Sequence, residues 1–128
     1  MGLYTDEFNV MVVEDDHTQR KLINKVLSKI EGVQTVLCVD AFEAYSVLIS
    51  KDKIDMVMLD VNLPHTQGTS LVTKLRSMTR YENLPILLST AESSLEGTVA
   101  AQATGILTKP YDVRQIRIFI DAFRSVEQ

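Results

Sequence analysis

Residues 8–16, FNVMVVEDD, decide the fold of this 128-residue chain. The first six of them form a short, almost wholly apolar run, which is the pattern of a strand buried on both faces. Three acidic residues follow at once. A buried strand that ends in acids is typical of a parallel sheet, because such sheets carry their ligand sites at the carboxyl ends of the strands.

Four more apolar runs follow along the chain, and segments with helical spacing alternate with them. The predicted strands are Phe8–Val13, Val33–Val39, Ile54–Leu59, Pro85–Leu88 and Gly105–Thr108. This alternation predicts an α/β fold: a doubly wound, five-stranded parallel sheet of flavodoxin-like order 2-1-3-4-5, with helices on both faces.

The predicted helices differ in how clearly their ends are marked. The first ends before Gly32, and the second runs from an Asp40 cap to about Ser50, with Glu43 completing a capping box. The helix predicted over Ser93–Ala103 is the weakest, because Gly, Thr and Val are poor helix formers. Asp112 is expected to cap the last helix, whose inward side chains are Val113, Ile116, Phe119, Ile120 and Phe123.

The bulk properties exclude several classes of function. The length fits one domain, residues 1–128, with a core from about 7 to 125. A net charge of -4 and a pI near 5.1 argue against direct nucleic-acid binding. No apolar run is long enough to cross a membrane. Because Cys38 is the only cysteine, we expect a buried thiol in a reducing, cytoplasmic setting.

Charged and hydroxyl side chains follow four of the five predicted strands. Glu14 and Asp15 follow the first strand, Asp60 the third, Thr90 the fourth and Lys109 the fifth. Each alone could be a helix cap or a surface residue. Together they predict a site at one sheet edge, where clustered carboxylates call for a cation. Oxygen ligands favour Mg²⁺, and a carboxylate beside it can act as a nucleophile on phosphorus.

Four segments resemble the signature segments of response-regulator receiver domains. They are Phe8–Asp16, Met56–Gly68, Leu84–Glu92 and Thr108–Tyr111. The resemblance covers about residues 7–125 and includes both the order and the spacing of the motifs. It implies a phosphoacceptor switch of a two-component system, in which a histidine kinase or phosphotransfer protein passes a phosphoryl group to this chain.

The resemblance also implies roles for the residues at the metal. Asp60 is expected to accept the phosphoryl group. Asp15 would bind Mg²⁺ directly, Glu14 through a water molecule, and Asn62 through its backbone carbonyl. The chain would then carry its own phosphorylation and dephosphorylation chemistry without being an enzyme that turns over a separate substrate.

Further roles follow from the same resemblance. Thr90 would be the switch hydroxyl and Lys109 the partner of a phosphoryl oxygen, with a cis bond before Pro110. Asn62 and Glu92 flank the path of the attacking water in this family, and this pair predicts a short-lived phosphoryl group.

The chain departs from the family pattern near its fifth strand. Lys109 comes nineteen positions after Thr90, about three fewer than usual, and Ile106 stands where the family's aromatic switch residue is expected. The output surface would be formed by the fourth helix, fifth strand and fifth helix. On it, Ile118 is expected to be exposed, either as a scattered apolar residue or as the anchor of a partner or homodimer interface.

Other readings of the sequence stay open. An inactive receiver would serve only as a protein-interaction module. A phosphatase of the haloacid dehalogenase type would need a second Asp two residues after the nucleophile, where this chain has Asn62. A flavodoxin-like cofactor domain would need a Gly- or hydroxyl-rich loop after the first strand. The sequence does not decide between a stand-alone regulator and a receiver cut from a longer protein.

Overall fold

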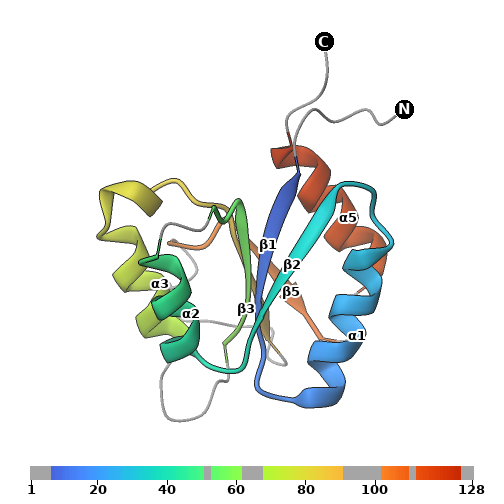
Figure 1. Ribbon diagram of the computed structural model, residues 1–128, viewed down its shortest axis with the longest axis horizontal. Helices are drawn as coiled ribbons and strands as arrows, with labels where there is room; N and C mark the ends of the chain where they lie inside the picture. Colours follow the sequence, from blue (N-terminus) through green and yellow to red (C-terminus); the bar gives the residue numbers. More distant parts are fainter. Residues whose placement is uncertain (1–6, 51–52, 62–67, 91–101, 110–111, 125–128) are drawn as a thin grey trace.

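The sheet has five parallel strands in the order β2-β1-β3-β4-β5, as predicted (Figure 1). The computed structural model describes residues 7–50, 53–61, 68–90, 102–109 and 112–124. Its strands are β1 (Phe8–Val13), β2 (Val33–Cys38), β3 (Met56–Asp60), β4 (Ile86–Thr90) and β5 (Gly105–Thr108). Its helices are α1 (His17–Ser28), α2 (Ala41–Leu48), α3 (Gly68–Arg76), the 3₁₀ turn η1 (Thr79–Tyr81) and α5 (Val113–Phe123). The helix predicted over Ser93–Ala103 lies almost entirely outside the described residues.

The helices cover the sheet as two layers, with α1 and α5 on one face and α2 and α3 on the other (Figure 1). Side chains alternate along each strand with a period of two, so each strand supplies both layers. In β1, for example, Val10 and Val12 pack in the α1–α5 layer, whereas Met11 and Val13 pack in the α2–α3 layer. This alternation decides which face each strand-end side chain takes.

The predicted helix caps Asp40 and Asp112 are present, and a third cap, Asp16, takes up one of the three acids that follow β1. Asp16 accepts a hydrogen bond from the Gln19 N–H at 2.8 Å and begins α1. Asp112 and Gln115 form a reciprocal capping box at the start of α5. At α2 the box is incomplete, because Glu43 accepts from the N–H of Val39 instead of that of the cap residue.

The last helix shows where periodicity alone misled the prediction. Ile116 and Ile120 are buried and Phe119 packs partly against the core, as expected. Val113 and Phe123 were predicted to point inward but are 48% and 43% exposed. They lie at the edges of the apolar stripe of α5, where a side chain is buried only if a neighbouring element packs over it.

Arg76, at the end of α3, links the segment before β4 to the segment before β5. Its guanidinium donates to the backbone carbonyls of Tyr81, Leu84 and Gln102 at 3.0, 2.7 and 2.8 Å. It also lies 3.3 Å from the hydroxyl of Thr104. The start of β4 and the segment leading into β5 are therefore fastened to the same side chain.

Tyr81 completes the end of α2 from a position 33 residues away in sequence. Its buried hydroxyl donates to the carbonyl of Leu48, one of the final carbonyls of a helix that lack an intrahelical partner. Replacing Tyr81 by Phe is expected to lower the free energy of unfolding by about 1–2 kcal/mol, because the buried carbonyl loses its donor. Urea denaturation measures this. Tyr45→Phe, which keeps its ring beside Lys74, is the matched control and should change stability by less than about 0.5 kcal/mol.

Cys38 is fully buried in the core, as expected, and burial raises the pKa of its thiol to about 12. The charges of Glu43 and Asp40 act in the same direction. Deprotonation is therefore shifted to higher pH. At pH 8 the folded chain should hold about a thousandfold less thiolate than the unfolded chain. Reaction with a disulfide reagent should be slow in the native protein and rapid in urea. Native labelling as fast as in urea would contradict this assignment.

Within the part of the chain that the structure describes, every helix is too short or too polar to span a bilayer.

Candidate functional site

Three strand-end side chains share one face of the sheet because of the period-two alternation. Glu14 continues the series Val10, Val12, and Asp60 continues the series Met56, Met58; all four of these apolar residues lie in the α1–α5 layer. Lys109 follows Leu107 of β5 by two residues, and Leu107 lies in the same layer. The parallel strands end at the same edge, so the two acids and the lysine meet there.

The lysine bridges the two buried acids. Its Nζ lies 3.5 Å from Glu14 Oε1 and 3.4 Å from Asp60 Oδ2. The Glu14 and Asp60 side chains are only 2% and 6% exposed, while the Lys109 side chain is 21% exposed. One ammonium therefore serves two carboxylates that water scarcely reaches, and the cluster keeps an excess of negative charge.

Asp15 completes an acidic group that fits a metal ion. Glu14, Asp15 and Asp60 each offer a carboxylate oxygen, and these oxygens lie within 4.8 Å of one another. Burial raises the pKa of the Glu14 carboxyl from 4.5 to about 7, and its hydrogen bond to Asp60 and the charge of Asp60 add to the shift. The Asp16 N–H and the Lys109 charge oppose it. Such a group suits a hard divalent cation with oxygen ligands, such as Mg²⁺.

Arg20 supports the site and was missed by the sequence analysis. From α1 its guanidinium donates to the carbonyl of Glu14 at 2.8 Å and to that of Asp15 at 3.2 Å. It also lies 3.3 Å from Nδ1 of His17. The contact fixes the backbone that presents both acids. An arginine four residues after a helix cap is too common a pattern to have identified this role.

The remaining predicted residues lie around this centre in different ways. Thr90 is buried at the end of β4, and its carbonyl accepts the Lys109 N–H at 2.7 Å. Asp60 pairs in register with Ser89. Thr90, the next residue of β4, therefore faces the side of the sheet opposite to Asp60. Ile106 pairs with Leu88 and is 43% exposed. Asn62, Glu92 and Pro110 lie outside the described residues.

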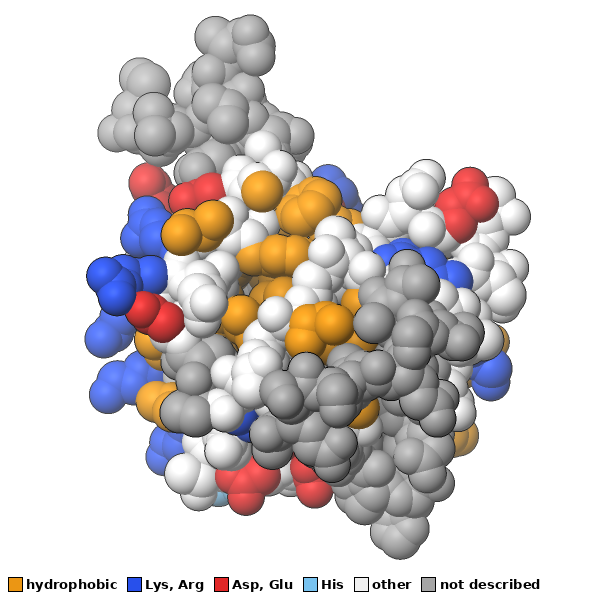
Figure 2. Space-filling model, turned by 180° about the vertical axis from the view of Figure 1, so that it is seen from behind, with side chains coloured by type: hydrophobic (Ala, Val, Ile, Leu, Met, Phe, Trp, Pro, Cys, Tyr) orange, Lys and Arg blue, Asp and Glu red, His pale blue; other side chains and the backbone are white. Residues whose placement is uncertain are grey.

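Apolar side chains are exposed on the surface formed by β5 and α5. Ile118 is 69% exposed, as predicted, and Ile106 and Phe123 are each 43% exposed. Figure 2 views the molecule from behind and shows hydrophobic side chains gathered in the middle of that face, with Lys and Arg along its left border. Exposed apolar side chains gathered in this way are typical of a protein-contact surface.

Comparison with known proteins agrees with this geometry. The family model of the response regulator receiver domain matches residues 10–121. Chemotaxis protein CheY-3 of Vibrio cholerae is 30% identical over 123 residues, which cover 94% of each chain. The crystal structure of CheY4 of Vibrio cholerae superposes with a TM-score of 0.81 at 28% identity, covering 91% of this chain and 98% of that one.

A more distant structure shares the same fold. The regulator TrrA of Thermotoga maritima, solved in complex with Mg²⁺–BeF, gives a TM-score of 0.81 at 20% identity and covers 91% of this chain and 98% of its own. The span that the family model matches, residues 10–121, includes β1 from Val10 onward, the other four described strands and most of α5. With its 2-1-3-4-5 sheet and acids at the strand ends, the chain belongs to the family of response-regulator receiver domains.

Proposed function

We propose that this chain is a working phosphoacceptor switch, a single receiver domain that takes a phosphoryl group onto Asp60. The observation that carries the proposal is the placement of Asp60: it ends a fully buried strand, its carboxylate shares a metal-sized group with Glu14 and Asp15, and Lys109 lies 3.4 Å away. The family supplies a phosphodonor class, a sensor histidine kinase or a histidine phosphotransfer protein.

The residues divide the work of phosphoryl transfer. Glu14, Asp15 and Asp60 would hold Mg²⁺ with the backbone carbonyl of Asn62, and the ion supplies neutralisation of charge on the phosphoryl oxygens. A carboxylate oxygen of Asp60 attacks phosphorus; the P–N bond to the donor histidine breaks as the P–O bond forms, and the freed imidazole takes up a proton. The ammonium of Lys109 then leaves its carboxylate partners to pair with a phosphoryl oxygen.

The reverse half of the switch uses the same site. Water attacks the phosphorus of the aspartyl phosphate, and the bond between phosphorus and the Asp60 oxygen breaks. Inorganic phosphate is released, and the Asp60 carboxylate is restored. Asn62 and Glu92 flank that path in the proposal and predict a short lifetime. Thr90 would move toward the phosphoryl group and report it to a partner through the surface that includes β5 and α5. We place this activity in the cytoplasm.

Intact mass after incubation with acetyl phosphate and Mg²⁺ tests the proposal. The wild type should gain the mass of one phosphoryl group, and EDTA should prevent the gain. Asp60→Asn should gain nothing, whereas Asp16→Asn, which alters a helix cap, should behave as the wild type does. A folded wild type that never gains this mass, or an Asp60→Asn variant that gains it equally, would overturn the assignment and favour a receiver used only for protein contact.

A further inference from the structure

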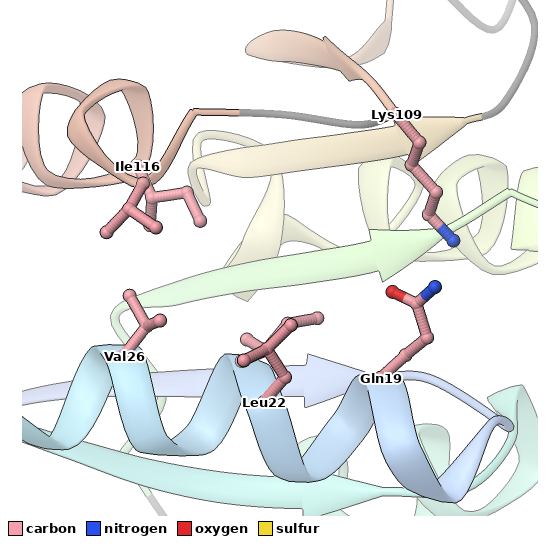
Figure 3. Close-up of a pocket in the computed structure, with 7 residues that line it drawn as sticks. Gln19, Leu22, Val26, Lys109 and Ile116 are labelled. Atoms are coloured by element: carbon pink, nitrogen blue, oxygen red, sulfur yellow. The ribbon is translucent and has the colours of Figure 1, made fainter.

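A groove between α1 and α5 begins beside Lys109 and runs away from the acidic cluster (Figure 3). It consists of two adjacent cavities of about 390 and 380 Å³, which share Val26 and Val113 as lining residues. Leu22 and Val26 point into it from α1, and Ile116 points into it from α5. Each lobe has the volume of a small-molecule site.

The walls of this groove keep apolar surface in water. Leu22 is 59% exposed and Val113 is 48% exposed, although both lie beside the buried residues Ile23 and Ile116. Two large apolar side chains on facing helices form a continuous patch rather than scattered surface residues. An apolar molecule lying between them would remove both from water without any rearrangement of the core.

The groove carries positive charge at one end, whereas at the other end the charge of its lysine is neutralised by nearby acids. The lobe away from the phosphoacceptor site is lined by Lys29, Arg114 and Arg117, and no acid is among the described residues that line either lobe. Arg114 forms a short ion pair with Asp112 at 2.7 Å, whereas the ion pair between Arg117 and Asp121 is long, at 3.8 Å. Lys29 and Arg117 are therefore the cations best placed to bind an anion.

The other end of the groove repels an anion. Lys109 lines it, but its ammonium points away from the apolar wall and is shared by Glu14 and Asp60. A negatively charged group placed there would meet three clustered carboxylates. A ligand with one anionic end and one apolar end would thus bind in a single orientation, with its apolar end toward Lys109.

We propose that the α1–α5 groove is a binding site for an amphiphilic anion. The apolar body lies along Leu22, Val26 and Ile116, and the anionic head pairs with Lys29 and Arg117. The site is separate from Asp60 and does not depend on phosphorylation. The aliphatic part of Lys109 forms one wall, so the bound molecule touches a residue that also contacts the acidic cluster.

Titration with three probes of the same chain length tests charge and shape together. Decanoate carries the proposed features, decanol lacks the charge, and decyltrimethylammonium reverses it. Amide chemical shifts should change saturably on α1 and α5 with decanoate, decanol should bind several-fold more weakly, and the cation should bind weakest. Equal binding of all three probes, or shift changes centred on another surface, would overturn the proposal.

Substitutions locate the two halves of the site. Lys29→Gln with Arg117→Gln should weaken decanoate binding about fivefold and leave decanol unchanged. Leu22→Gln should weaken both. Lys53→Gln and Ile49→Gln alter an exposed cation and an exposed apolar residue elsewhere and should change neither. If these controls weaken binding as much as the groove variants do, the assignment is wrong.

Two further measurements separate this proposal from its alternatives. Asp60→Asn should bind decanoate as the wild type does, so loss of phosphorylation and loss of groove binding can be told apart. Light scattering should show one oligomeric state with and without decanoate. A dimer that forms without ligand, is abolished by Leu22→Gln and excludes decanoate would assign the groove to a second copy of the chain and overturn the proposal.

Discussion

Asp60→Asn is expected to make the metal-free protein more stable at pH 8, by about 1–2 kcal/mol in the free energy of unfolding. The substitution removes a buried charge whose oxygen lies within 4.8 Å of oxygens from Glu14 and Asp15. Two repulsions and one desolvation penalty are lost, and the attraction of Lys109 at 3.4 Å is given up. Lys109 keeps Glu14 as its partner at 3.5 Å.

The same variant should lose most of its response to Mg²⁺. Saturating Mg²⁺ is expected to stabilise the wild type by about 2–3 kcal/mol, because the ion binds the folded state alone. Thermal unfolding with Mg²⁺ and with EDTA measures both effects, and Asp16→Asn should keep the full response, since Asn caps a helix as well as Asp does. If Asp60→Asn is less stable than the wild type in EDTA, repulsion among the three carboxylates does not destabilise the metal-free protein.

The gain in stability should depend on pH in a defined direction. The folded pKa of Glu14, about 7, lies above its ordinary value of 4.5. A raised carboxyl pKa means that the folded state loses stability as the pH rises from 4.5 through 7. The difference between wild type and Asp60→Asn should therefore be largest above pH 7 and shrink as the pH falls below it, where Glu14 is protonated.

Lys109→Met is expected to fail in two separable ways. Its rate of phosphorylation by acetyl phosphate should fall about 10²–10³-fold, because the phosphoryl oxygens lose a donor. In EDTA its free energy of unfolding should fall by about 2 kcal/mol, less than for a fully buried pair because the lysine is 21% exposed. Met keeps most of the aliphatic length, so the loss reflects the charge.

Mg²⁺ should restore the stability of Lys109→Met but not its rate, because the ion replaces the missing positive charge only for the carboxylates. Intact-mass time courses and urea denaturation separate the two effects. Lys53→Met is the matched control, since Lys53 is 67% exposed and lies 3.8 Å from its acid; it should change neither quantity appreciably. A Lys109→Met protein with the wild-type rate would remove the lysine from the mechanism.

Local signals were enough to predict the five strands, although the ends of β2, β3 and β4 differ from the prediction by one or two residues. They were also enough to predict that Glu14, Asp15, Asp60 and Lys109 lie together. Phe8–Val13 and Gly105–Thr108 have the predicted bounds, because short apolar runs between turn residues leave little choice. The site followed from topology: once the strands are parallel, the residues after them must meet at one edge. Asp16 also shows the limit of that argument, because it shares the acidic run but caps α1 instead of joining the cluster.

Contacts between side chains and the backbone of other segments could not be predicted from the chain. Arg20, Arg76 and Tyr81 all act on backbone carbonyls, and a carbonyl has no signature in the sequence. The exposure of Val113 has the same origin, since the apolar stripe of α5 predicted burial but the spacing between α1 and α5 leaves a groove there. Such features depend on how helices pack, which a single sequence determines only through the whole fold.

The Arg76 contacts limit which substitutions this position can accept during evolution. One planar guanidinium satisfies carbonyls of Tyr81, Leu84 and Gln102 in different directions. A lysine has a single nitrogen and could reach few of them, so Arg→Lys, a change usually accepted on protein surfaces, would leave carbonyls without donors here. Among natural variants of this chain, position 76 should therefore drift as little as the acids of the site, although it takes no part in their chemistry.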